Sequence, residues 1–189
     1  MKNTYLGISI SIDKDSIRKY TNNMMSMLPF RELECPDVEQ ISGDIWQFLN
    51  SHTNIMSERS VGKNFTWNFF SAMELVTKVP RLDAWFRSIN LRLRDVAATV
   101  TNTKEGLVPH KDEPPVVAKI NFPVINTRDT WNVWWDDEGR EVGRIQMLKP
   151  LAFNGAMMHA VEMGPTCIYP RVVLSCMFMR EPSHLLQVP

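Results

Sequence analysis

The second half of the chain is a succession of short, strand-like segments with no helical spacing between them, and this feature limits the fold more than any other. The segments are rich in valine, isoleucine and aromatic residues and are separated by glycine, proline, asparagine and aspartate. Strands are predicted at Leu91, Leu93 and residues 96–101, 116–124, 130–135, 144–147, 151–153 and 168–179. Short strands without intervening helices predict an antiparallel sandwich or barrel rather than a βαβ fold.

Two amphipathic helices are predicted ahead of these strands. The first ends near Ser51 and His52 and is indicated by apolar residues at helical spacing: Val38, Ile41, Ile45, Phe48 and Leu49. The second follows Pro80 and is indicated by Leu82, Trp85, Phe86 and Ile89. Residues 64–70 are aromatic but have no clear period, so no element is assigned to them. The predicted fold class is α+β, mainly β with N-terminal helices.

A chain of 189 residues suits a single domain. Residues 1–90 are expected to form a partly helical support, residues 91–180 the β core, and residues 181–189 a tail. The 21 basic side chains balance the 21 acidic ones, which excludes a protein built mainly to coat nucleic acid. Three cysteines without a CxxC spacing argue against a disulfide framework and favour a reducing compartment.

Residues 5–12, the first apolar stretch, are too few for a signal peptide and are not followed by a small-residue cleavage site. No apolar run approaches the ~18–20 residues that a membrane helix needs. We therefore expect a cytoplasmic protein that does not enter the membrane.

The chain has four histidines, and two of them stand in a context that suits metal binding. His110 and Asp112 are two residues apart, so both side chains point to the same side of an extended segment. A polar surface loop before Pro114 would explain this pair equally well. His159 follows in another strand-like context, and two histidines with one carboxylate are a ligand set for non-haem Fe(II). His52 and His184 are expected to be bystanders.

Arg171 opens the apolar run of the last predicted strand, where a charged side chain needs a partner. Ser175 lies four residues further on and therefore faces the same way. Pairing of Arg171 with a nearby carboxylate is the simple interpretation. Bidentate binding of a dicarboxylic acid is the functional one.

Together, His110, Asp112, His159, Arg171 and Ser175 resemble the Fe(II)/2-oxoglutarate-dependent oxygenase superfamily over about residues 91–179. The resemblance implies a double-stranded β-helix, the jelly-roll or cupin-like barrel, preceded by helices. It also implies Fe(II) on the two histidines and Asp112, and 2-oxoglutarate held through its C5 carboxylate by Arg171 with help from Ser175. The usual R-x-S spacing is stretched here, which preserves strand parity but would place Ser175 deeper.

Three further residues are weaker candidates. Asn121 lies on the strand after the HxD segment, where family members often place a polar group near the co-substrate. Trp131 and Trp134 would face opposite sides of their strand, and either of them could contact substrate or pack in the core.

The resemblance implies a small hydroxylase that uses Fe(II), 2-oxoglutarate and O₂. A peptide, a protein side chain or a free amino acid is the expected substrate. Oxidative demethylation of a nucleobase is an alternative, with a flipped base stacked on Trp131 or Trp134. A non-catalytic, cupin-like binding module is the alternative from another class, because fold alone does not fix function.

Overall fold

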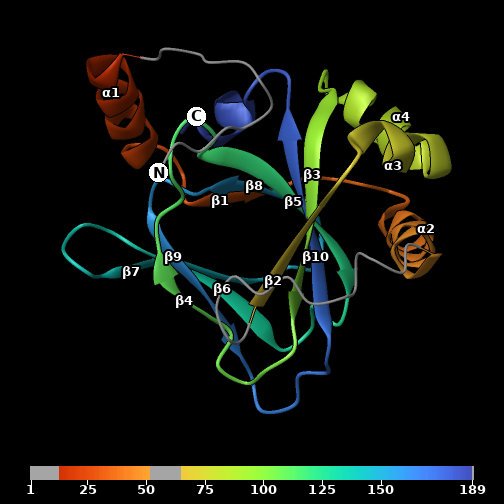
Figure 1. Cartoon of the computed structure of the whole chain (residues 1–189). Coiled ribbons are helices and arrows are strands. Elements are labelled where there is room, and N and C mark those ends of the chain that lie inside the picture. The colour runs from red at the N-terminus through yellow and green to blue at the C-terminus, as the bar shows by residue number, and fades with distance from the viewer. Residues whose placement is uncertain (1–12, 52–64, 189) are drawn as a thin grey trace, which may run out of the picture.

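The structure, a computed structural model, describes residues 13–51 and 65–188. Two antiparallel sheets face each other (Figure 1). The six-stranded sheet has the order β1 (Phe30–Glu32), β8 (Leu151–Asn154), β5 (Ala118–Ile125), β10 (Arg171–Phe178), β3 (Leu93–Thr101) and β2 (Phe65–Phe70). The four-stranded sheet has the order β4 (Leu107–His110), β9 (Met158–Met163), β6 (Thr130–Trp135) and β7 (Glu141–Gln146). Both are open sheets, and the fold is α+β.

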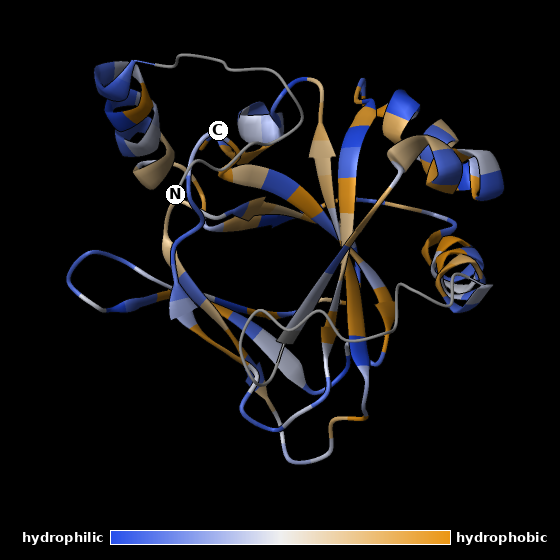
Figure 2. Cartoon of the chain, viewed as in Figure 1, coloured by the Kyte–Doolittle hydropathy of each residue, from blue (hydrophilic) through white to orange (hydrophobic). Residues whose placement is uncertain are grey.

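Helices accompany the larger sheet, with α2, α3 and α4 along one side of it (Figure 1). The helical elements are α1 (Lys14–Met25), α2 (Val38–Ser51), α3 (Ala72–Lys78), α4 (Pro80–Ser88) and the short 3₁₀ helix η1 (Pro182–Leu186). Ser71 caps α3 by accepting a hydrogen bond from the Glu74 amide, and Pro80 occupies the first turn of α4. Figure 2 shows apolar residues along α2 and the sheet, and a hydrophilic loop between β6 and β7.

Alternation along β5 and β10 divides their side chains between two environments. Ile120 and Phe122 on β5, with Leu174 on β10, join the core cluster that also contains Ile41 and Phe86 of the helices. The residues between them point to the opposite face of the sheet. Because both faces are covered, each strand is buried along almost its whole length, and this explains why most of its residues are apolar.

The predicted elements are largely confirmed, and seven were missed. The helices expected around residues 38–49 and 82–89 and the six predicted strand regions all form, with ends that shift by a few residues. The elements α1, α3, β1, β2, β4, β9 and η1 were not predicted, and β2 occupies the aromatic stretch left unassigned. His52 lies outside the described residues.

The first 90 residues contribute more than helical support, because β1 and β2 form the two edges of the larger sheet. The expected tail is also packed: Leu186 is fully buried and its carbonyl accepts a hydrogen bond from the Leu28 amide at 2.8 Å. No helix in the described part of the chain has the length and apolar character to span a membrane.

Candidate metal centre

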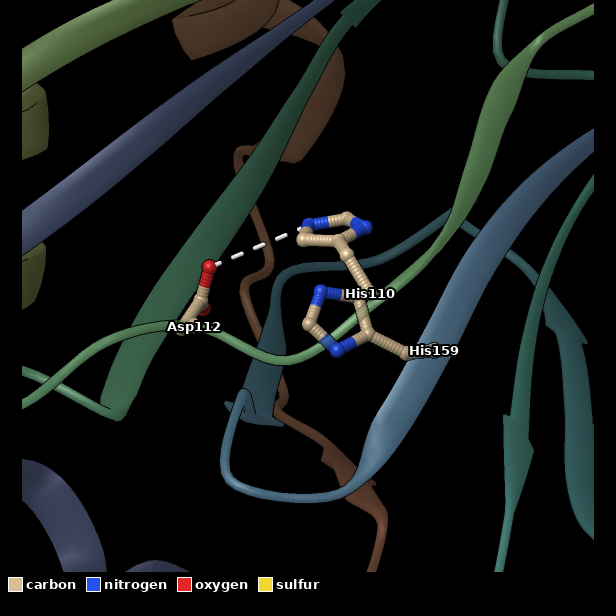
Figure 3. Close-up of side chains that lie close together, drawn as sticks. All are labelled: His110, Asp112 and His159. Carbon is tan, nitrogen blue, oxygen red and sulfur yellow. Dashed lines mark ion pairs between the residues drawn. The ribbon is translucent and has the colours of Figure 1, made fainter.

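Strand pairing brings two histidines together. His110 at the end of β4 is the register partner of His159 on β9, and their ring centroids lie 4.2 Å apart. Asp112 follows β4, and its backbone amide donates to the Gly155 carbonyl at 2.7 Å. One potential ligand atom from each of these three side chains lies within 4.8 Å of the other two (Figure 3).

Both imidazoles are oriented by the backbone in the same way. Nδ1 of His110 lies 2.9 Å from the Val108 carbonyl oxygen, and Nδ1 of His159 lies 2.9 Å from that of Met157. A carbonyl oxygen can only accept, so Nδ1 carries the proton and Nε2 keeps its lone pair. Burial lowers the pKa of His159 to about 4, which keeps this imidazole neutral. Neutral imidazoles with free Nε2 atoms suit metal coordination.

The two oxygens of the Asp112 carboxylate face different residues. Oδ1 lies 3.9 Å from Nε2 of His110, and a dashed line marks this pair in Figure 3. Oδ2 is buried, accepts no hydrogen bond of normal geometry, and forms an ion pair with Nζ of Lys119 at 2.5 Å. Two imidazoles and a carboxylate oxygen that faces them fit a divalent transition-metal ion.

Arg171 is a buried cation with no carboxylate partner among the described residues. Its Nε donates to Thr130 Oγ1 at 3.0 Å, and Nη2 donates weakly to Asn132 Oδ1 at 3.5 Å. Burial alone lowers the pKa of Arg171 to about 10. Oγ1 of Thr101, its register partner on β3, is also buried without a hydrogen-bond partner. This end of the site therefore has donors available for an anion.

Asn121 on β5 and Ser175 on β10 are register partners, and both side chains line this cavity. The Ser175 hydroxyl donates to Asn121 Oδ1 at 2.9 Å, and both side chains are buried. Strand parity predicted that Ser175 faces the same way as Arg171, and both residues line the cavity. The hydrogen bond fixes the Asn121 amide so that its two N–H donors remain available.

One narrow cavity, open at its mouth, connects the histidines with Arg171. Its lining includes His110, His159, Arg171, Asn121 and Ser175. Sequence reasoning missed eight other lining residues, among them Trp67, Lys119, Asn132 and Phe153. Lys119 was detectable, since it stands two residues before Asn121 in an otherwise apolar strand.

The two tryptophans expected at the substrate do not line this cavity. Trp134 is fully buried, and its indole N–H donates to the Asn154 carbonyl at 3.2 Å. Its ring packs 4.9 Å from the ring centroids of Phe30 and Phe153. Trp131 lies three residues before Trp134 on β6 and therefore points to the other face of that sheet. Of the two interpretations, the structure shows core packing for Trp134, and contact of either tryptophan with substrate stays a prediction.

No protein-family model matches the sequence, and no curated protein matches it significantly. Solved structures do share its fold. A protein from Shewanella oneidensis, provisionally named an oxygenase, aligns with a TM-score of 0.53 and 10% identity over 91% of this chain and 89% of its own. AviO1 from Streptomyces viridochromogenes Tue57 aligns with a TM-score of 0.50 and 10% identity over 87% of this chain and 96% of its own. At this identity the likeness shows a shared fold.

Proposed function

We propose that the chain is an Fe(II)- and 2-oxoglutarate-dependent oxygenase with a double-stranded β-helix core. His110, Asp112 and His159 would hold the iron, and Arg171 would bind the C5 carboxylate of the co-substrate. With O₂, the bound iron and 2-oxoglutarate would supply the chemistry that hydroxylates a substrate C–H bond. The fold shared with a protein provisionally named an oxygenase supports this proposal.

The observation that carries the proposal is the unpaired, fully buried guanidinium of Arg171 in the same cavity as the His–Asp–His cluster. An isolated buried charge is costly, and a protein retains one where a ligand supplies the opposite charge. A metal site that served only structure would gain nothing from a carboxylate receptor in the same cavity. This argues against a non-catalytic, cupin-like module.

We propose further that Asn121 and Ser175 support the bound co-substrate. The Asn121 amide offers N–H donors to the cavity because its oxygen already accepts from Ser175. The polar groups of the cavity would orient the co-substrate, while its apolar walls limit the entry of water.

A slender side chain of a peptide, a protein or a free amino acid is the substrate that we propose. The cavity is narrow, which favours a slender substrate group. With 2-oxoglutarate inside, the remaining room favours a side chain over a flipped base. The positions of Trp131 and Trp134 outside the lining also weigh against a stacked nucleobase. The free thiols of all three cysteines support a cytoplasmic location.

Anaerobic titration of metal-free protein with Fe(II), followed by 2-oxoglutarate and monitored by visible absorption, tests this function. We expect a charge-transfer band that requires both additions and that disappears in His159→Ala. Arg171→Ala should shift its appearance to a much higher co-substrate concentration. His184→Ala is the matched control and should retain the band, because His184 lies on η1 and does not line the cavity. Absence of the band and of 2-oxoglutarate-dependent heat in the wild type would refute the proposal.

Substrate class is tested next through 2-oxoglutarate turnover under air. Peptides and free amino acids should stimulate the release of succinate. Stimulation by a methylated oligonucleotide alone would replace our substrate assignment with the nucleobase alternative.

A further inference from the structure

Lys119 is a buried lysine at the metal centre whose role the proposed ligand set leaves open. It lies on β5, and its side chain is only 7% exposed. Its Nζ is 5.4 Å from the ring centroid of Trp67 and 5.2 Å from that of Phe153. Its ion-pair partner is Asp112, at 2.5 Å. Because burial of an ammonium group is costly, this contact dominates the environment of Lys119.

The two oxygens of Asp112 are held in different ways. Oδ1 faces the imidazole of His110, whereas Oδ2 points to Lys119 and packs against Gly155. A Cβ atom at Gly155 would overlap the carboxylate, so the contact is as close as a glycine allows. The backbone hydrogen bond from Asp112 to Gly155 fixes the same two residues a second time. The carboxylate therefore has one orientation, with Oδ1 directed into the site.

We propose that Lys119 is a positioning residue that retains Oδ2 of Asp112 and thereby limits this ligand to one oxygen. The inference rests on the proposed function. Carboxylates bind metals through one or both oxygens, and a second oxygen from Asp112 would occupy a coordination position that a chelating co-substrate or O₂ needs. Lys119 keeps that position open and also offsets the charge of the buried carboxylate.

A purely electrostatic ion pair predicts the opposite metal affinity. If Lys119 acted only as a nearby positive charge, its removal would relieve repulsion of a divalent cation and tighten metal binding. If Lys119 positions Asp112, its removal frees the carboxylate and weakens the site. The sign of the change in affinity therefore distinguishes the two roles.

Titration of metal-free protein with Co(II), followed by visible absorption and calorimetry, measures this sign. We expect Lys119→Met to raise the Kd for Co(II) by about 10-fold or more, the usual loss when a residue that orients a metal ligand is removed. The ligand-field bands of Co(II) bound to Lys119→Met should also weaken, because a second Asp112 oxygen would raise the coordination number of the metal. The control is Lys111→Met, which removes a lysine that is 41% exposed and paired with Asp137. This variant should bind Co(II) like the wild type.

An unchanged or lower Kd in Lys119→Met, with the wild-type spectrum, would overturn the positioning role while leaving the proposed function intact. A wild-type protein that binds no Co(II) would overturn both. If Lys119→Met does not fold, infrared spectra of the wild type with ¹³C-labelled aspartate decide the question. A wide splitting of the carboxylate stretches on metal loading supports one-oxygen binding, and a narrow splitting overturns it.

Discussion

The Asp112 carboxylate packs directly against Gly155, and the Asp112 amide donates to the Gly155 carbonyl at 2.7 Å. Gly155 lies in the turn between β8 and β9, and its own amide donates to the Val117 carbonyl at 2.6 Å. The turn therefore locates the proposed carboxylate ligand from both its backbone and its side chain. A residue without a Cβ is required there because the space is already filled by Asp112.

Gly155→Ala should displace the Asp112 carboxylate and weaken metal binding. The added methyl group would overlap the carboxylate, so either Asp112 or the β8–β9 turn must move. We expect the Kd for Mn(II) or Co(II) to rise by about 10- to 100-fold, as for other losses of ligand orientation. Calorimetric titration of the metal-free protein measures this change.

Gly43→Ala is the matched control for that substitution. Gly43 lies within α2, and a Cβ there would meet nothing within 4 Å. Alanine should stabilise the helix by about 0.5–1 kcal/mol and leave metal affinity unchanged. Equal metal affinities for the two alanine variants would contradict the role assigned to Gly155.

Arg171→Met should stabilise the ligand-free protein and abolish its stabilisation by 2-oxoglutarate. Methionine removes a buried charge that has no carboxylate partner, so we expect the free energy of unfolding to rise by about 1–3 kcal/mol. With Mn(II) present, 2-oxoglutarate at about 100 times its Kd should stabilise the wild type by about 2.7 kcal/mol. Chemical denaturation with and without the co-substrate measures both quantities.

Arg144→Met provides the comparison for Arg171. Arg144 is 35% exposed and pairs with Glu141 and Glu162 on the surface. Its loss should cost at most about 1 kcal/mol and leave the effect of 2-oxoglutarate unchanged. A ligand-free Arg171→Met protein that is much less stable than the wild type would show that the guanidinium serves the fold instead.

Titration of the Glu181 carboxyl should lower the free energy of unfolding as pH rises. Burial raises the pKa of this carboxyl, while hydrogen bonds from the Val117 and Ala118 amides oppose the shift; Tyr20 also donates to it. The folded protein therefore binds this proton more tightly than the unfolded chain does. The stabilising effect is full below the ordinary glutamate pKa of 4.5 and is lost as pH rises through the raised value.

Glu181→Gln removes this titration and keeps a side-chain oxygen for the two amides. The free energy of unfolding of the variant minus that of the wild type should increase with pH across the same window and then level off. Urea denaturation of both proteins between pH 4 and 8 measures the difference. A difference that stays constant with pH would show that the Glu181 carboxyl titrates normally in the folded protein.

Asn154→Ala should both destabilise the fold and weaken binding at the proposed metal centre. The fully buried Asn154 side chain donates to the carbonyls of Met24 and Leu28 and accepts from the Ala156 amide. Alanine leaves these buried groups without partners, at a cost of about 1–3 kcal/mol for each group left unsatisfied. We expect a lower melting temperature in thermal unfolding and a higher Kd in Co(II) titration. Asn50→Ala, an exposed change at the end of α2, should alter neither.

Much of the fold was predictable because local sequence and final environment agree. Residues 130–135 were predicted as a strand and form β6 with the same limits. The aromatic run that became β2 was not predicted, because it is an edge strand whose pairing with β3 depends on a distant segment. The 3-residue strand β1 carries too few residues for a period to show.

The residues proposed for the site were found by chemistry and parity. His110, Asp112, His159 and Arg171 carry residue types whose spacing points to a metal and an anion, and strand parity added Ser175. Lys119 was missed because its role depends on the orientation of Asp112, which no spacing predicts. For Trp134 both packing and substrate contact stayed open, because aromatic residues are common in cores and in binding sites.

The register pairing of His110 with His159 also bears on how the chain folds. These partners come from strands β4 and β9, which are separated in sequence by β5 to β8. Long-range pairing of this kind is slow to form, since the intervening chain must be ordered before the contact is gained. The two imidazoles would therefore meet late, after collapse of the sheets. The metal would then bind only after the native topology is complete. It would shift the folding equilibrium toward the native state only at that last stage.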